Sequence, residues 1–555
     1  MTDNGLEKIN KLILGLILVT VAFNIVFLMR YNFEADSAFY ITLAQEQIRT
    51  GSLFPDGMYY STGLFILTPN LLVIPFLFLT NNLVLARQLA ILLLWVVVYI
   101  VLYKFFVTRE ERNVPGFIIA SGLFSVLYVN SSVVSMHFYQ GAYICYLLFQ
   151  LIFLTFMKRV IIKGYTDRNR LILLCLLYII ANLGDIRNLL IWGIPGLVSY
   201  IIYIVLRSGG DFKVLENDTE AKNVIRVLFY SILLAFIFCF VLARAYGTGG
   251  STAGTFLISS KDFGQSFNAI IIGLFSLCGN IPETFFFSGG GFFKLINVLF
   301  ALILFLLVPS IAVKYLKKFD YKSSKYIILF SLISSLIYFV VVFMTGAAIA
   351  EDRYLIPLYN NGILIFAVVL GFYLQKYHTK LLPVVIFSFL VYVLACNSYY
   401  LVCQKESLVN KKFGFFAQGI EGVTDFLESK GLYYGYATFF NAETYSVLSN
   451  NKVNVRSIRF EKGKIMPDYW LTVKRFYDPV NYNGSSFLML THDELKYYFP
   501  KGFVGLGLGD PKEVLMFKNY LIYVYGYNIA SKFSEGKKLY YLIRGKQTGT
   551  YISTQ

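Results

Sequence analysis

Four short segments of the sequence place ionisable side chains next to long apolar runs, where a charge is costly unless it faces water or a partner. They contain Glu34 and Asp36; His137; Asp185 and Arg187; and Glu351, Asp352, Arg353 and Tyr354. A carboxylate can accept the proton of a hydroxyl group, and an arginine binds phosphate through its planar fork of N–H donors. Together these residue types predict a site that handles a hydroxyl and a phosphate.

The first two segments each allow a chemical and a structural interpretation. Asp36 is either a catalytic base or a cap for the helix that begins beside it, and Glu34 is either a supporting group or a solvated one. His137 is one of only three histidines in the chain. It is either a substrate contact or a hydrogen-bonded structural residue between two membrane helices.

The last two segments each contain an arginine. Asp185 and Arg187 either staple a tight turn as a local ion pair or direct the guanidinium at an anionic head group. Arg353 stands beside Tyr354 and four residues before Pro357, which loosens the start of a helix. We interpret Arg353 as a phosphate-binding residue, and the alternative is a side chain that anchors the helix at the membrane surface.

The composition is that of a membrane protein. Of the 555 residues, 57% are hydrophobic and 15% are charged, against roughly 25% charged residues in soluble domains. The formal charge of +17 does not indicate nucleic-acid binding, because the basic residues fall mostly in short loops between apolar runs. The six cysteines form no CxxC pair, so neither a zinc site nor a disulfide framework is predicted.

The topology depends on Thr62–Thr80, which is apolar enough to cross a bilayer but contains Pro69 and Pro75. If this segment crossed, the basic loop Lys104–Arg112 would lie on the same side as Asp36, and basic and neutral loops would no longer alternate. We therefore predict that it stays at the membrane surface, with the N-terminus in the cytoplasm and the C-terminus outside a bacterial cell membrane. About eleven spans are expected, at residues 11–29, 86–106, 115–133, 138–157, 171–184, 188–206, 224–244, 291–312, 326–345, 354–373 and 381–400.

Two domains are expected. Residues 1–401 form a transmembrane domain whose first exterior loop, about 30–85, opens with an amphipathic helix at 36–49 that lies flat on the membrane. Residues 402–555 have the composition of a small exterior α/β domain. Its helices are predicted at 414–430 and 441–450, and its strands at 433–439, 452–460, 485–490 and 514–527.

The pattern of these residues resembles the GT-C superfamily of polyprenyl-phosphate-dependent glycosyltransferases, in the branch of the aminoarabinose-lipid transferase and the protein mannosyltransferases. In that branch an acidic motif after the first span opens an interfacial helix, and further motifs begin later spans. The matching positions here are Asp36, Tyr40 and Gly51; Pro69, Pro75, Asn81, Asn82 and Arg87; and Arg353, Tyr354 and Pro357. Many members carry two adjacent acids in the first loop, whereas Asp36 is followed here by Ser37.

The resemblance implies an inverting glycosyltransferase that moves a sugar from a polyprenyl-phosphate donor to the hydroxyl of a glycan, lipid or protein acceptor. Asp36 would be the base, with Glu34, His137, Asp185, Arg187, Arg353 and Tyr354 contacting substrate. A divalent cation, Mg²⁺ or Mn²⁺, is the one cofactor the resemblance allows, and no metal ligand is assigned. Two alternatives stay open: a transporter or flippase of a lipid-linked glycan, and a non-catalytic relative that binds glycolipid.

Overall fold

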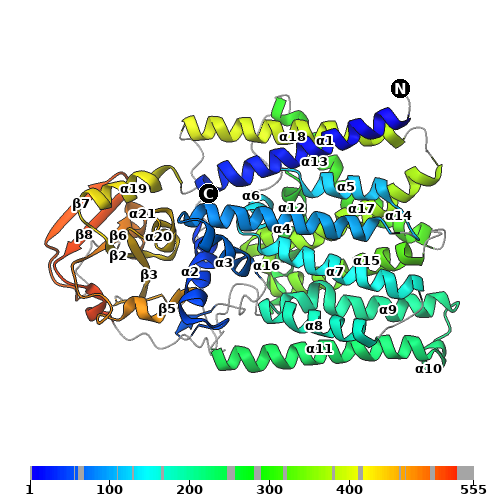
Figure 1. Cartoon of the computed structure of the whole chain (residues 1–555), viewed down its shortest axis with the longest axis horizontal. Helices are drawn as coiled ribbons and strands as arrows, with labels where there is room; N and C mark the ends of the chain where they lie inside the picture. The colour runs from blue at the N-terminus through cyan, green and yellow to red at the C-terminus, as the bar shows by residue number, and fades with distance from the viewer. Residues whose placement is uncertain are drawn as a thin grey trace.

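The structure, a computed structural model, shows a helical bundle with a sheet-containing domain at one end (Figure 1). It describes residues 3–55, 57–60, 68–108, 110–127, 131–163, 168–246, 257–279, 289–316, 322–377, 382–410, 417–461, 464–468, 470–499 and 507–533. The long helices run side by side, and α1 (Asp3–Phe23) begins at the end of the bundle away from the sheet (Figure 1).

Nine helical segments among the described residues are long and apolar enough to cross a membrane. Each has 19 to 25 residues, which matches the ~20 residues that a helix needs to traverse hydrocarbon. They are Lys8–Leu28, Leu83–Phe106, Ala142–Ile162, Leu189–Arg207, Thr219–Val241, Leu295–Lys314, Lys322–Thr345, Asp352–Lys376 and Pro383–Val402. These segments confirm a multi-pass membrane protein.

The other two expected spans, 115–133 and 171–184, are shorter apolar helices. They are α5 (Val114–Phe124) and α8 (Arg168–Gly184). Helix α5 ends early because its chain bends after Phe124, and Asn397 satisfies the backbone there. The Asn397 amide donates to the carbonyl of Ser125 at 2.9 Å and its oxygen accepts from the Leu127 N–H at 2.8 Å. The break is therefore a packed feature inside the bundle.

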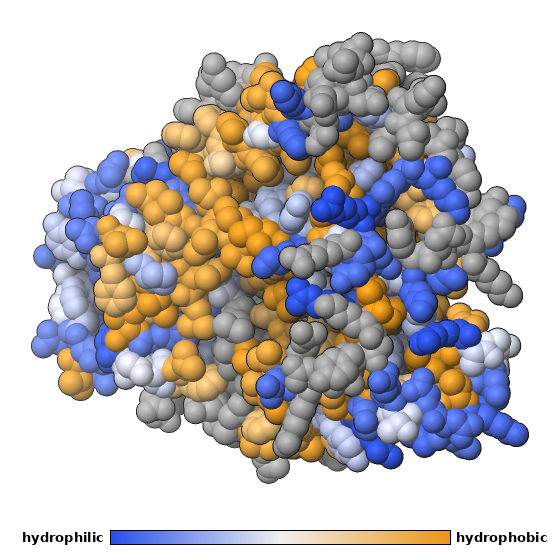
Figure 2. Space-filling view, turned by 45° about the vertical axis from the view of Figure 1, so that its right-hand side comes forward, coloured by the Kyte–Doolittle hydropathy of each residue, from blue (hydrophilic) through white to orange (hydrophobic). Residues whose placement is uncertain are grey.

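The surface of the bundle is apolar between two polar ends. Figure 2 shows a broad hydrophobic area that borders the hydrophilic surface of the C-terminal domain on one side and further hydrophilic residues on the other. On α11 (Thr219–Tyr246), Phe229 and Phe240 are 52% and 62% exposed. Outward-facing apolar side chains on this scale fit contact with lipid tails.

Two helices lie at the end of the bundle next to the C-terminal domain (Figure 1). Helix α2 (Ala35–Thr50) runs across the ends of the bundle helices, which is the orientation expected for an interfacial helix. Helix α3 (Pro69–Leu79) has 11 residues, too few to cross hydrocarbon. It occupies the described part of the segment Thr62–Thr80, whose residues up to 67 lie outside the described ones.

The C-terminal domain is built on a six-stranded mixed sheet in the order β4-β3-β2-β6-β8-β7. Strand β2 pairs in parallel with β3 and β6, and the remaining pairs are antiparallel. The strands are β2 (Tyr434–Thr438), β3 (Asn454–Glu461), β4 (Lys464–Pro467), β6 (Ser486–Thr491), β7 (Glu513–Phe517) and β8 (Tyr520–Tyr525). Helices α19 (Ala417–Ser429), α20 (Glu443–Leu448) and α21 (His492–Tyr498) accompany them.

Two details of this domain refine the sequence interpretation. The single strand expected at 514–527 is the hairpin β7–β8, which turns at Lys518 with a φ of 53°. Phe476 and Tyr477 are 7% and 8% exposed and belong to the core of the domain. They are therefore packing residues and not a platform on which a sugar could stack.

The loop that follows the first span, about residues 30–85, is joined to the C-terminal domain. Strand β1 (Met58–Tyr59) pairs antiparallel with β5 (Thr472–Val473). Helix α18 (Leu382–Asn410) runs continuously through the domain boundary that was expected between residues 401 and 402. The remaining elements near the site or within the bundle are α4 (Leu83–Phe106), α6 (Ser131–Val134), η3 (Ser135–Tyr139), α7 (Ala142–Lys163), α9 (Ile194–Arg207), α12 (Phe263–Leu277), α13 (Gly289–Leu302), α14 (Val308–Tyr315), α15 (Lys322–Thr345), α16 (Ala347–Ala350), η8 (Asp352–Leu355) and α17 (Ile356–Tyr377).

Candidate active site

Asp36 and Arg353, which are more than three hundred positions apart in the sequence, form an ion pair. The Oδ2 atom of Asp36 lies 3.7 Å from Nη1 of Arg353, and the two side chains are 32% and 27% exposed. Asp36 is the second residue of α2, so the expected capping role does not apply. A carboxylate in the first helical turn is favoured by the helix dipole, and here it also keeps an open side that a reactant could reach.

Glu34 lies next to Asp36 and is bridged to it by an amide. The Oε1 atom of Glu34 accepts hydrogen bonds from Ser135 Oγ and from Gln140 Nε2, both at 2.5 Å. The same Gln140 nitrogen lies 3.4 Å from Asp36 Oδ2. Gln140 therefore holds the two carboxylates at a fixed separation.

Different neighbours act on the pKa values of the two carboxyl groups. Burial raises the pKa of Glu34 to about 7, and the nearby negative charge of Asp36 adds to the rise. Burial also raises the pKa of Asp36, and the opposing charge of Arg353 limits this rise. The guanidinium of Arg353, 3.7 Å from Asp36 Oδ2, favours the ionised form of Asp36.

Ser135 and Gln140 share a face because the chain forms a π-helical turn. The backbone N–H of Gln140 donates to the carbonyl of Ser135, five residues earlier, at 2.7 Å. Such wide turns bring residues five apart to one side and are frequent at functional sites. The sequence pointed to His137 in this segment, but the side chains that reach the carboxylates are those of Ser135 and Gln140. The signal was the polar pair Gln140–Gly141 in an apolar run.

His137 points into the bundle. Its side chain is 1% exposed, its ring lies edge-on to Trp95 at 6.4 Å, and its Nε2 has no hydrogen-bond partner. Burial lowers the pKa of His137 to about 3, so the ring is neutral. The structure therefore does not bring His137 together with the carboxylates, and its position agrees with the structural interpretation.

Asp185, which is buried, and Arg187, which is partly exposed, form an ion pair beside the main cluster. Arg187 Nη2 lies 2.6 Å from Asp185 Oδ2, and Tyr146 donates to the same oxygen at 2.5 Å. Nη1 of Arg187 also reaches the hydroxyl of Tyr143 at 3.5 Å. Tyr143 is within electrostatic range of both Arg187 and Arg353. The ion pair thus stabilises the turn between Asp185 and Arg187, as one interpretation expected. The guanidinium of Arg187 lies on the side of Tyr143.

The segment that carries Arg353 is fixed on both sides. Arg353 Nε pairs with Glu351, and its guanidinium lies 5.6 Å from the ring centre of Tyr354. Asp352 accepts hydrogen bonds from Ser132 at 2.6 Å and from Ser276 at 3.3 Å. These contacts leave Arg353 partly exposed and aimed at α2, which a simple membrane anchor would not require.

Arg87 is a buried cation that lies behind the cluster. The sequence did not predict it as a substrate contact. It is 0% exposed, donates to the backbone carbonyl of Gln140, and lies 4.7 Å from the ring centre of Tyr40. Its Nε and Nη1 atoms have no hydrogen-bond partner in the described structure. A buried guanidinium without a carboxylate is costly, so Arg87 contributes positive charge that an anion could neutralise.

The donor set does not fit a resident divalent cation. Among the described residues, no group of three or more His, Cys, Asp or Glu side chains is arranged to hold a metal ion. The guanidinium of Arg353 already stands against both Asp36 and Glu351. A cation at this place would have to displace a permanent positive charge, so the charge available to a phosphate is that of arginine.

The fold and the site together define a multi-pass membrane protein with a charged cluster at the bundle end that the C-terminal domain covers. The expected fold class, a helical membrane bundle with interfacial helices in the first loop and a small C-terminal α/β domain, is confirmed.

Neither a protein-family model nor a curated protein matches the sequence. The solved structures that are similar to the chain include the following two. One is the Archaeoglobus fulgidus oligosaccharyltransferase in complex with Zn and sulfate, at 12% identity and a TM-score of 0.38, covering 80% of this chain and 62% of that one. The other is ArnT from Cupriavidus metallidurans in the apo state, at 11% identity and a TM-score of 0.39, covering 94% and 98%. The chain spans 62% of the length of the archaeal oligosaccharyltransferase.

Proposed function

We propose that the protein is a membrane glycosyltransferase that moves a sugar from a polyprenyl-phosphate donor to the hydroxyl group of an acceptor on the extracytoplasmic side of a bacterial cell membrane. The observation that carries the proposal is the pairing of Asp36 with Arg353 at 3.7 Å. The pair places a general base next to a permanent positive charge at the end of the helical bundle. There the head group of a lipid donor and an acceptor substrate from the aqueous phase can meet.

The reaction is an in-line substitution at the anomeric carbon. The acceptor oxygen forms the new bond to that carbon while its proton passes to Asp36. The bond between the carbon and the phosphate oxygen breaks on the opposite face, and the electron pair leaves with the phosphate, so the configuration inverts. Arg353 stabilises the negative charge that develops on the phosphate oxygen. Glu34 and Gln140 hold Asp36 in place.

The other two arginines supply positive charge around the same phosphate. Arg187 lies on the Tyr143 side of the cluster and Arg87 lies behind Gln140. The unpartnered N–H groups of Arg87 favour an anion as the group that completes its surroundings. A phosphate bound among three guanidinium groups would be a better leaving group than one held by Arg353 alone.

The orientation follows from the loop charges. Helix α2, which carries Asp36, lies at the end of the bundle next to the C-terminal domain (Figure 1), and basic and neutral loops alternate along the chain. With the basic loops in the cytoplasm, the cluster and the C-terminal domain lie outside. The acceptor, a glycan, lipid or protein, would then approach from the exterior aqueous phase.

The test is transfer by the purified protein in lipid nanodiscs. Radiolabelled polyprenyl-phosphate sugars are incubated with cell-envelope acceptors, and label in the acceptor is measured against the Asp36→Asn variant. Time-dependent transfer by the wild type alone supports the proposal. Saturable donor binding without transfer from any donor would overturn it and favour a non-catalytic glycolipid-binding protein. Movement of the intact lipid-linked sugar between leaflets, again without transfer, would instead indicate a flippase.

A further inference from the structure

Helix α2 belongs to two hydrophobic cores at once. Ala38, Ile41 and Ala44 pack in the main core of the bundle, whereas Phe39 and Leu43 pack in a core that otherwise consists of first-loop and C-terminal-domain residues. All five side chains are at most 1% exposed. The helix that carries Asp36 is therefore enclosed between the two parts of the molecule, although its sequence looked like that of a helix with one wet face.

The charged contacts of α2 toward the C-terminal domain centre on Glu46. The side chain of Glu46 is 3% exposed, and Arg475 holds both of its oxygens: Nε lies 3.2 Å from Oε1 and 3.3 Å from Oε2, and Nη2 pairs with Oε1. Arg49, three residues further along α2, pairs with the same carboxylate at 2.8 Å. Of these two contacts to Glu46, the one from Arg475 crosses from α2 to the C-terminal domain, and the one from Arg49 lies within α2.

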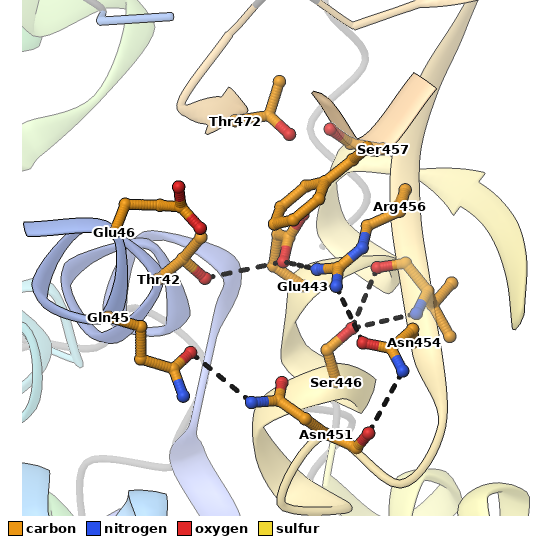
Figure 3. Close-up of polar contacts among 12 residues, drawn as sticks. Thr42, Gln45, Glu46, Glu443, Ser446, Asn451, Asn454, Arg456, Ser457 and Thr472 are labelled. Atoms are coloured by element: carbon orange, nitrogen blue, oxygen red, sulfur yellow. Dashed lines mark hydrogen bonds and ion pairs between the residues drawn. The ribbon is translucent and has the colours of Figure 1, made fainter. Parts of the chain in front are cut away.

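A second set of polar contacts lies beside the first (Figure 3). Glu443 is 1% exposed and pairs with Arg456 at 2.9 Å, and the same Glu443 oxygen accepts a hydrogen bond from Thr42 of α2 at 3.5 Å. Gln45 accepts from Asn451 at 3.4 Å. Near the Arg475 contact, the Lys474 N–H donates to the carbonyl of Gly57 at 2.8 Å, next to the β1–β5 pairing.

These contacts bear on Asp36 because α2 acts as a rigid lever. Asp36 and Glu46 are ten residues apart, which is about 15 Å along a helix. A tilt of α2 of roughly 4° about Glu46 would therefore move Asp36 by about 1 Å, and a displacement of that size can cost on the order of 100-fold in rate. The bundle side of α2 contributes Ala38, Ile41 and Ala44, whose apolar contacts are non-directional. The ion pair between Glu46 and Arg475 is, by contrast, a directional contact on the other side of the helix.

We propose that the C-terminal domain is the positioning element of the active site, and that Arg475 is a positioning residue which, through Glu46, holds α2 so that Asp36 faces Arg353. The consequence for catalysis rests on the proposed function, whereas the control of α2 by Arg475 does not. A domain that stands on the catalytic helix can also transmit the arrival of an acceptor on its surface to the base.

The variants are Arg475→Gln, Glu46→Gln and the double variant, with Arg49→Gln as the matched control. Arg49→Gln removes a guanidinium from the same carboxylate but leaves the contact between the two domains intact. Arg475→Lys tests rescue, because it keeps the charge and loses the two-pronged geometry. Each variant is measured as the full chain in nanodiscs.

The first readout is hydrogen–deuterium exchange of the peptide covering residues 35–43. We expect faster exchange in Arg475→Gln, in Glu46→Gln and, to the same extent, in the double variant, because the two residues act as one pair. Arg49→Gln should exchange like the wild type, and Arg475→Lys should lie between. Unchanged exchange in Arg475→Gln would overturn the proposal, and so would an equal increase in Arg49→Gln. This readout needs no transfer activity.

The second readout is the pH dependence of kcat. In Arg475→Gln we expect kcat to fall on the order of tenfold, with the KM for the donor changed less than about twofold because the arginines around the phosphate stay in place. The acidic limb of the profile should move up by roughly half a pH unit, since Asp36 loses part of its contact with Arg353. A lower rate with an unmoved profile would indicate only a smaller folded fraction and would refute the positioning role. If the wild type transfers no sugar, the proposed function fails and the exchange experiment alone decides on Arg475.

Discussion

Replacement of Asp36 by Asn is the most direct perturbation of the site, because it removes the proton acceptor while keeping the size of the side chain. Loss of a general base costs about 10²- to 10⁴-fold in rate, which corresponds to about 3–5 kcal/mol in the activation free energy. We therefore expect kcat to fall by that factor in Asp36→Asn. The KM for the donor should change little, because the phosphate contacts of Arg353 remain.

The same substitution also removes the attraction between Asp36 and Arg353, and its size decides how the variant folds. At 3.7 Å two unit charges attract by about 1 kcal/mol in water and about 4.5 kcal/mol at an effective dielectric constant of 20. Both side chains keep about 30% of their surface in solvent (32% and 27%), so the net contribution lies toward the lower value once desolvation is subtracted. The melting temperature of Asp36→Asn should therefore stay within a few degrees of the wild-type value.

The assay is single-turnover transfer of label from a polyprenyl-phosphate sugar, with the melting temperature measured on the same preparation. Asp478→Asn is the matched control, because Asp478 is exposed in the C-terminal domain and accepts a backbone hydrogen bond from Val480 that an asparagine can also accept. Wild-type turnover in Asp36→Asn would show that another group takes the proton. A large loss of melting temperature would show that the pair with Arg353 is mainly structural.

Four further predictions test the other parts of the site. Arg353→Ala should lower kcat/KM by roughly 10²- to 10³-fold, as loss of a charge-stabilising donor does, with partial recovery in Arg353→Lys. Wild-type activity in Arg353→Lys would contradict a role for the guanidinium fork, and equal activity of the two variants would contradict a role for its charge. Glu34 has a pKa of about 7 in the folded protein, above its ordinary value of 4.5, so the folded state binds its proton more tightly and the free energy of unfolding falls as pH rises from about 4.5 to about 7. Glu34→Gln should abolish this fall in pH-dependent melting curves, and a decline of the same size in the variant would refute the assignment. Arg87→Met should raise the KM for the donor while leaving the melting temperature equal or higher, because it removes a buried cation without a carboxylate; a strongly destabilised variant would show that Arg87 is a packing residue. A cysteine in place of Asn81, which is exposed at the end of α3, should react with a membrane-impermeant thiol reagent from outside intact cells, and labelling only after lysis would reverse the orientation.

The sequence by itself determined the class of protein and most of its helices. A hydrophobic run of about 20 residues forms a helix in lipid, because a helix satisfies the backbone hydrogen bonds within its own segment. Nine of the eleven expected spans are correspondingly long helices. Prolines at 69 and 75 marked the segment that forms the short helix α3. The acids and arginines near the membrane surface were also visible, because charges are rare next to such runs.

The tertiary structure decided which of these charged residues meet. Asp36 and Arg353 are brought together by the packing of helices that lie more than three hundred positions apart in the sequence, a contact that no local pattern reports. In the second segment, the π-helical turn directs Ser135 and Gln140 to the carboxylates and His137 into the bundle. Because the backbone hydrogen bond here spans five residues and not four, Ser135 and Gln140, and not His137, contact the carboxylates.

The tertiary structure also decided the surroundings of α2. Its apolar residues recur at helical spacing, which predicted an interfacial helix with one face in water. The orientation was correct, but the C-terminal domain covers the second face, since Phe39 and Leu43 enter its core and Glu46 binds Arg475. The sequence of a single helix cannot reveal whether its polar face meets water or an arginine of another domain, because both satisfy a carboxylate. The sequence thus determined which acids and arginines could do chemistry, but not that Ser135, Gln140 and Arg87 lie beside them. Only the packing of the two domains decided that the helix carrying Asp36 is held from both sides.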